Sequence, residues 1–226
     1  LSPLRRLQIQ HLEIPPQVAD QAEELVEAGI VGDYEVAYPD GDWQPFDGQV
    51  ELLSLDELET LPPSLLARVD RLCIAGDQLV DPDRYDLWED WEHKDRNGNP
   101  TLQLHERDTD EVTPLSPGVV TDLGRLSVLT GLRELYLYGQ PLEKLDGIQI
   151  FSSLEQFSAK GCTALTDASA LFALSELRWV DLKCTQVDSL QGVQNLRELR
   201  FLDVSNTKVD DLTPLSECDF SQNREN

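Results

Sequence analysis

The segment that decides the fold reads Leu132-Arg-Glu-Leu135-Tyr-Leu137-Tyr-Gly-Gln140-Pro-Leu142. Apolar side chains occupy its first, fourth, sixth and eleventh positions, and a polar one occupies the ninth. Three further copies of the pattern begin at Leu154, Leu177 and Leu199, so successive starts lie 22, 23 and 22 residues apart. A fixed period of this size is typical of repeats that bury their apolar faces only by stacking on one another. We therefore expect a solenoid.

The pattern within one repeat predicts its local structure. Alternating apolar residues at positions four and six predict a short strand with one buried face. Repeats that follow one another in the same direction pair these strands in parallel. The segments between strands, such as residues 187–196, carry Asp and Leu at spacings of three and predict a tight 3-10 return. The strands would then line the concave side of a curved stack.

The repeat core resembles that of the leucine-rich repeat family, L-x-x-L-x-L-x-x-N-x-L, and its length resembles the short, 22-residue bacterial, internalin-like class. The resemblance implies an α/β solenoid of horseshoe form, with a parallel concave sheet and a convex side of 3-10 and short helices. One departure concerns position nine, where the family has Asn and this chain has Gln140, Cys162, Thr185 and Thr207. In the family that side chain hydrogen-bonds to neighbouring backbone. The substitutions therefore predict a less regular ladder.

The repeats define two regions and one interruption. A weaker copy begins at Val69, so we assign residues 66–226 to the solenoid and residues 1–65 to an N-terminal α+β cap. Within the cap, the pattern predicts a helix over residues 17–29 and strands over residues 34–38 and 50–52. After Leu215 the period breaks again, and the alternatives for that edge are a partner that covers it or further sequence.

The interruption spans about residues 81–117 and predicts an inserted segment. Asp81-Pro82 is a typical helix start, and Tyr85, Trp88 and Trp91 follow at spacings of three. Asn97-Gly98 is a turn signal. We expect a helix followed by a turn, with the aromatic side chains packed back on the solenoid.

Charge narrows the classes of partner. The 226 residues include 43 acidic and 18 basic side chains, a formal net charge of -25. This balance opposes binding to nucleic acid and to anionic membranes, because both are recognised by Lys and Arg. It would attract a basic partner. The sequence has no apolar run of the roughly 18 residues that a membrane span needs.

The four cysteines have no zinc-ligand spacing and no close pair. They are Cys73, Cys162, Cys184 and Cys218. We therefore expect free thiols in a reducing compartment, which predicts a cytoplasmic location. A secretory leader removed ahead of Leu1 stays an open alternative.

The candidate binding site follows from the register. Side chains at positions three, five and seven of each strand point to the concave face, and aromatic residues are enriched there. The candidate partner-binding residues are Glu134, Tyr136, Tyr138, Gln156, Lys160, Trp179, Asp181, Lys183, Phe201 and Asp203. The lysines and aspartates give this face mixed charge, so the overall acidity does not define its partner.

Signals for catalysis or metal binding are weak. Asp95, Asn97, Asn99 and Glu106 match positions one, three, five and twelve of a calcium-binding EF-hand loop, but Pro100 stands where that loop needs Gly. A polar hairpin or turn accounts for the segment better. His11, His93 and His105 have no motif partner, and no phosphate-binding loop, nucleophile elbow or dinucleotide-binding turn is present. We therefore expect no cofactor.

The sequence favours a non-enzymatic module that recognises a protein or peptide on the concave face. Two alternatives remain. One is a bacterial effector or hydrolase whose chemistry lies in the insertion or the N-terminal region, with the repeats choosing the substrate. The other is an acidic inhibitor of a basic, nucleic-acid-binding protein. Clustering of His93 and His105 with carboxylates around one cleft would favour the enzyme.

Overall fold

The computed structural model describes residues 9–14, 31–36, 54–96 and 98–218. The chain divides into two compact parts, residues 1–49 and 50–226. In the first part, β1 (Ile9–Ile14) and β2 (Val31–Val36) pair in parallel. The predicted strand over residues 34–38 overlaps β2. The predicted helix over 17–29 and the predicted strand over 50–52 lie outside the described residues.

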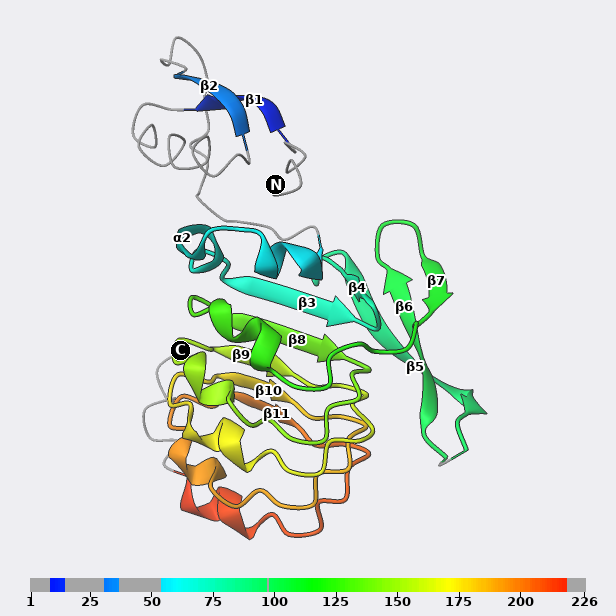
Figure 1. Cartoon of the computed structure of the whole chain (residues 1–226). Helices are drawn as coiled ribbons and strands as arrows, with labels where there is room; N and C mark the ends of the chain where they lie inside the picture. The colour runs from blue at the N-terminus through cyan, green and yellow to red at the C-terminus, as the bar shows by residue number, and fades with distance from the viewer. Residues whose placement is uncertain (1–8, 15–30, 37–53, 97, 219–226) are drawn as a thin grey trace. The chain divides into compact units, whose positions relative to one another are not determined.

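The second part contains a parallel sheet in the order β11-β10-β9-β8-β3, with the two-residue β4 antiparallel to β3 at one edge (Figure 1). Its strands are β3 (Arg71–Ala75), β4 (Gln78–Leu79), β8 (Glu134–Tyr138), β9 (Gln156–Ser158), β10 (Trp179–Asp181) and β11 (Phe201–Asp203). Equivalent positions of successive repeats are register partners, as in Gln156 with Trp179 and Trp179 with Phe201. The predicted parallel sheet is confirmed, with the register that the repeat spacing requires.

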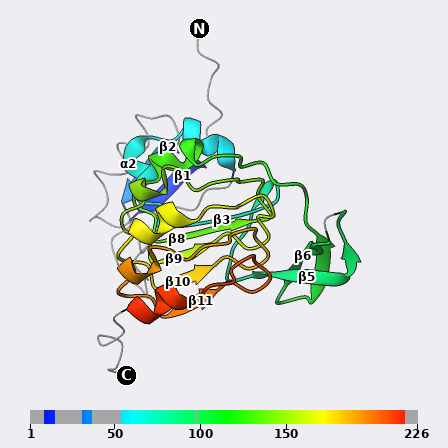
Figure 2. The same cartoon turned by 90° about the horizontal axis from the view of Figure 1, so that it is seen from below.

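Short 3-10 segments lie on the other side of the core from the parallel strands (Figures 1 and 2). They are η2 (Leu55–Glu59), η3 (Gly124–Val128), η4 (Ile148–Ile150), η5 (Ser169–Ala173), η6 (Val193–Asn195) and η7 (Thr213–Glu217), with the short α2 (Pro63–Leu66) beside β3. Leu58 and Leu66 join the same core as the repeats, so residues 54–66 belong structurally with them. No helix in the described ranges is long and apolar enough to cross a bilayer.

The core is built from the periodic apolar positions. Leu135, Leu137, Phe157, Val180 and Leu182 are fully buried, and all belong to one continuous cluster. Burial of each such side chain contributes about 1.5–3 kcal/mol to folding. Stacking of the repeats is therefore what stabilises them, because a single repeat has no second surface against which to bury these positions.

Position eight of every repeat adopts a left-handed backbone conformation that the sequence pattern did not reveal. The φ angles are +62° at Gly76, +64° at Gly139, +75° at Gly161, +58° at Cys184 and +56° at Asn206. Glycine adopts this conformation freely, whereas Cys and Asn carry a steric cost. The chain therefore turns out of each strand by the same backbone geometry, whichever residue stands there.

The hydrogen bonds of position nine differ between the repeats. The Gln140 amide donates to the carbonyls of Gly76 and Tyr138, both at 2.9 Å, and accepts from the amides of Val119 and Val120. The Cys162 thiol also reaches the preceding repeat, donating to the Leu137 carbonyl. The hydroxyls of Thr185 and Thr207 instead bond within their own turns, to Leu182 and Val204. The ladder is therefore irregular, since Gln140 and Cys162 reach the preceding repeat and the two threonines do not.

The interruption folds as a three-stranded antiparallel sheet, β5-β6-β7, and the predicted helix is wrong. Its strands are β5 (Tyr85–Lys94), β6 (Pro100–Glu106) and β7 (Glu111–Pro114). Leu87 and Leu104 are buried against Ala75 in a small second cluster, to which Tyr85 also contributes. The expectation that all three aromatic residues pack back is wrong as well, because Trp88 and Trp91 stay 47% and 43% exposed. The spacing of three was coincidental, since β5 buries Leu87 and exposes the adjacent Trp88, as neighbouring residues of a strand do.

Candidate partner-binding face

Aromatic rings from three strands form a continuous column on the parallel sheet. The ring centroids of Tyr136 and Trp179 lie 6.1 Å apart, and those of Trp179 and Phe201 lie 5.1 Å apart with the ring planes within 8°. Trp179 and Phe201 are direct register partners, so the backbone pairing places their rings side by side. The column leads from the buried middle of the sheet to its last strand, where Phe201 is 43% exposed.

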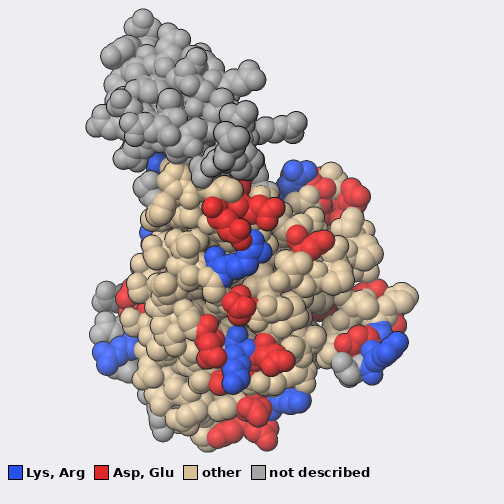
Figure 3. Space-filling view, in the orientation of Figure 1, with Lys and Arg blue, Asp and Glu red and all other residues tan. Residues whose placement is uncertain are grey.

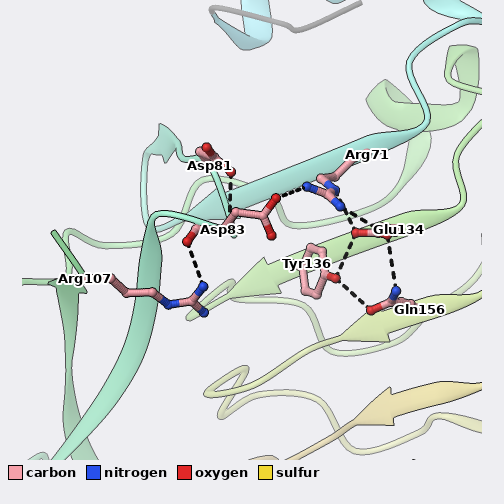
Figure 4. A network of polar contacts seen from close by, with 7 residues as sticks. All are labelled: Arg71, Asp81, Asp83, Arg107, Glu134, Tyr136 and Gln156. Atoms are coloured by element: carbon pink, nitrogen blue, oxygen red, sulfur yellow. Dashed lines mark hydrogen bonds and ion pairs between the residues drawn. The ribbon is translucent and has the colours of Figure 1, made fainter. Parts of the chain in front are cut away.

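Tyr136 is the buried end of this column and organises a polar network (Figure 4). Its hydroxyl lies 3.0 Å from both Glu134 Oε2 and Gln156 Oε1. The Gln156 amide donates to Glu134, and Arg71 Nε lies 2.7 Å from Glu134 Oε2. Burial, together with the Glu134 carboxylate, raises the pKa of Tyr136 well above its usual range. With a side chain only 8% exposed, Tyr136 supports its neighbours more than it offers contact to a partner.

The inserted sheet covers the position-seven side of the face. Lys160 Nζ donates to the Leu87 carbonyl at 2.6 Å and lies 2.6 Å from Glu89 Oε1. Lys183 Nζ lies 2.9 Å from the other Glu89 oxygen. Glu89, 11% exposed, thus bridges two successive repeats. Burial alone would raise the pKa of Glu89, but hydrogen bonds from both lysines outweigh burial and lower it.

Apolar contacts also hold the inserted sheet against the repeats. Leu102 of β6 packs over the left-handed Gly161, where a Cβ would lie 2.3 Å from Leu102 Cδ1. Leu115, directly after β7, packs over the left-handed Gly139, where a Cβ would lie 2.5 Å from Leu115 Cδ2. Tyr138 packs against the small cluster around Leu87 and Leu104. Burial raises the pKa of Tyr138 far above its usual range. Tyr138 therefore belongs to the surface on which the insertion packs.

The two predicted aspartates differ in accessibility. Asp181 is buried, accepts hydrogen bonds from the Lys183 amide at 2.9 Å and the Ser158 hydroxyl at 3.3 Å, and burial raises its pKa. Asp203, its register partner on the last strand, stays partly exposed and accepts a hydrogen bond from the Ser205 amide at 2.8 Å. Only Asp203 of this pair is available to a partner.

The ten predicted residues therefore share one face, on which Glu134 and Tyr136 form the polar network and the other eight divide into two groups. Lys160, Lys183 and Tyr138 contact the insertion, and Asp181 is buried beside Lys183. Gln156, Trp179, Phe201 and Asp203 form the open part of the face, bordered by the Arg71–Glu134 pair. Sequence reasoning missed Glu89 because its partners lie 71 and 94 residues further along the chain. The alternation of Tyr85, Leu87 and Glu89 was the available signal.

The two carboxylates of the weak calcium candidate lie far apart. Asp95 precedes β6 and Glu106 ends it, so β6 holds the two carboxylates about 20 Å apart. Asp95 accepts hydrogen bonds from the backbone and side chain of Asn99, in the hairpin that the sequence favoured, and Glu106 accepts one from Arg84. Asn97 lies outside the described residues. Among the residues that the structure describes, no three metal-ligating side chains cluster.

The histidines of the insertion lie apart. His93 Nδ1 lies 2.8 Å from Asp90 near the hairpin end, where Asp90 is the register partner of Thr101. His105 lies four residues further along β6, about 13 Å away along the strand, and its ring stacks on Trp88 at 3.8 Å. The structure therefore does not bring His93 and His105 together.

The net charge of the chain is not concentrated in one patch on the face drawn in Figure 3. Acidic and basic side chains lie side by side there, with uncharged surface around them. Ion pairs of the described residues, such as Arg178 with Glu155 at 3.2 Å, neutralise part of the acidic charge. Local recognition thus depends on which charges remain unpaired.

Comparisons with known proteins give the following result. No family model matches the chain, and no curated protein matches it. Among solved structures it is similar to an internalin C2 from Listeria monocytogenes, with 23% identity and a TM-score of 0.35 over 43% of this chain and 53% of that one. It is also similar to an internalin F from the same organism, with 26% identity and a TM-score of 0.33 over 43% of this chain and 35% of that one. The chain thus spans about half the length of the first and about a third of the second. The periodic sequence and the parallel sheet with its 3-10 returns together give this chain a leucine-rich-repeat-like fold.

Proposed function

We propose that the chain is a non-enzymatic recognition module that binds a protein or peptide on the open part of its concave face. The observation that carries the proposal is the stacked pair Trp179 and Phe201, which stays accessible at the edge of a rigid sheet. Exposed aromatic rings held in place by neighbouring side chains are typical of residues that dominate binding energy. Gln156 and Asp203 beside them supply hydrogen-bonding groups.

The surrounding network gives this face a fixed shape. Tyr136 and Glu134 are held by Gln156 and Arg71, and Glu89 fixes the position-seven side through two lysines. A surface that is already ordered loses little conformational entropy when a partner binds. An extended peptide laid across the strands would contact the rings of two repeats at once.

The test is selection of peptides from a random library against the immobilised chain, followed by calorimetry with the selected peptide. Phe201→Ala and Trp179→Ala should each weaken binding by about tenfold or more. Ile150→Ala is the matched control, since Ile150 has the same 43% exposure but lies on η4. If the selected peptide bound both ring variants as tightly as the wild type, the proposed face would be wrong.

A further inference from the structure

The open part of the concave face has a different charge balance from the face as a whole. The three basic side chains of the whole face are already neutralised: Arg71 lies 2.6 Å from Asp83 and 2.7 Å from Glu134, and Lys160 and Lys183 share Glu89. The sequence places mixed charge on this face, but after ion pairing the charge left on it is negative. The insertion produces this change, because Glu89 and Asp83 both come from the segment between β4 and β6.

The remaining charge lies at Asp203. Within the described part of the chain, neither Asp203 nor its neighbour Asp181 forms an ion pair with a basic side chain. Asp181 is buried, whereas Asp203 is partly exposed and accepts a single backbone hydrogen bond. An ionised carboxylate can accept about four hydrogen bonds, so Asp203 retains acceptor capacity toward solvent.

Phe201 presents a ring face beside this carboxylate. The Trp179 ring covers one face of the Phe201 ring in a near-parallel stack, so the other face points away from Trp179, toward the outer side of the last strand. Phe201 and Asp203 are two residues apart on β11 and point to the same side, with Cα atoms about 6.6 Å apart. A cation within about 6 Å of the ring can therefore also reach the carboxylate.

We propose that the Phe201 ring and the Asp203 carboxylate bind an arginine side chain from a basic segment of a protein partner. A planar guanidinium stacks on an aromatic face and donates paired hydrogen bonds to a carboxylate, whereas an ammonium offers only a compact charge. The net charge of -25 steers such a segment toward the chain. This assignment rests on the proposed function and specifies the chemistry of its partner.

The test measures binding of fluorescein-labelled hexa-arginine to the full chain by anisotropy at about 0.15 M salt, where general attraction is screened. Hexalysine and hexacitrulline are the comparison peptides, since citrulline keeps the shape of arginine without its charge. The variants are Phe201→Ala and Asp203→Asn. Asp188→Asn, which removes one exposed carboxylate from the turn after Val187, is the control for net charge. Circular dichroism confirms that each variant is folded.

We expect hexa-arginine to bind about two- to fivefold more tightly than hexalysine, and hexacitrulline to bind far more weakly. Asp203→Asn should weaken hexa-arginine binding about tenfold and Phe201→Ala two- to fivefold, against less than twofold for Asp188→Asn. Equal losses for Asp203→Asn and Asp188→Asn would mean attraction by overall acidity and overturn the site. Equal affinity for hexalysine would overturn the arginine assignment.

The two proposals fail in different ways. If Phe201→Ala abolishes binding of the library-selected peptide but leaves hexa-arginine unaffected, the arginine site is wrong and the recognition face stands. If Phe201→Ala changes neither, and Trp179→Ala also leaves binding of the selected peptide unchanged, both proposals are wrong.

Discussion

Gly161→Ala tests how the inserted sheet is seated on the repeats. Gly161 and Gly147 both have left-handed backbone, with φ of +75° and +88°. A Cβ at position 161 would lie 2.3 Å from Leu102 Cδ1, whereas one at position 147 would meet nothing within 4 Å. Both substitutions therefore carry the same cost for an alanine in left-handed backbone. Only Gly161→Ala adds a collision between the repeats and the inserted sheet.

The expected losses in the free energy of unfolding follow from the backbone cost and the collision. An L-residue in the left-handed region costs about 1–2 kcal/mol, so Gly147→Ala should lower the free energy of unfolding by about that amount. Forcing a methyl group into a packed contact costs about 1–3 kcal/mol more, so Gly161→Ala should lose about 2–5 kcal/mol. Leu102→Ala removes the colliding atoms. The Gly161→Ala/Leu102→Ala variant should therefore lose about 1–2 kcal/mol less than the sum of the single variants.

The assay is urea unfolding of the wild type and the four variants, followed by circular dichroism and tryptophan fluorescence, with the denaturant dependence compared between them. Equal losses for Gly161→Ala and Gly147→Ala would show that Leu102 does not press on the repeats. Strict additivity of Gly161→Ala and Leu102→Ala would refute the seating in the same way.

Three further variants test the polar groups. Glu89→Gln should lower the free energy of unfolding by about 1–3 kcal/mol, because it removes the carboxylate between two lysines. The folded pKa of Glu89 is lowered, so the contribution of this carboxylate to the free energy of unfolding is complete above the usual glutamate pKa of about 4.3. That contribution declines as pH falls toward the folded pKa. Identical acid-unfolding profiles of the wild type and Glu89→Gln would contradict this. Gln140→Leu should cost about 3 kcal/mol or more in urea unfolding, because it leaves buried backbone groups at Gly76 and Val120 without partners. Asp181→Asn should leave the unfolding midpoint at pH 7 unchanged or raise it, since burial disfavours the charge there; a loss above about 2 kcal/mol would show that the charge is needed.

The periodic part of the fold was predictable because its information is local. Leu132, Leu154, Leu177 and Leu199 set a spacing that determines both strand register and core, and the structure has that register. Position eight escaped notice because Gly, Cys and Asn share a backbone conformation rather than a side-chain property. The insertion was misassigned because its aromatic spacing matched a helix by chance.

The candidate face was predictable in position but not in accessibility. Strand alternation placed Tyr136, Trp179 and Phe201 on one side, and the ring contacts bring them together. Which of them stays open depends on where the insertion docks. That depends on the pairing of Glu89 with Lys160 and Lys183, and no local pattern encodes contacts between segments so far apart in the chain.

The most direct measurement of the central claim is photo-crosslinking of the library-selected peptide, carrying a benzophenone side chain, to the full chain, with adducts located by mass spectrometry. We expect adducts on residues 156–158, 179–181 and 201–205, and their loss when unlabelled peptide competes. Adducts confined to η3–η7, or to the outward side of β5–β7 around Trp88, would contradict recognition on the concave face.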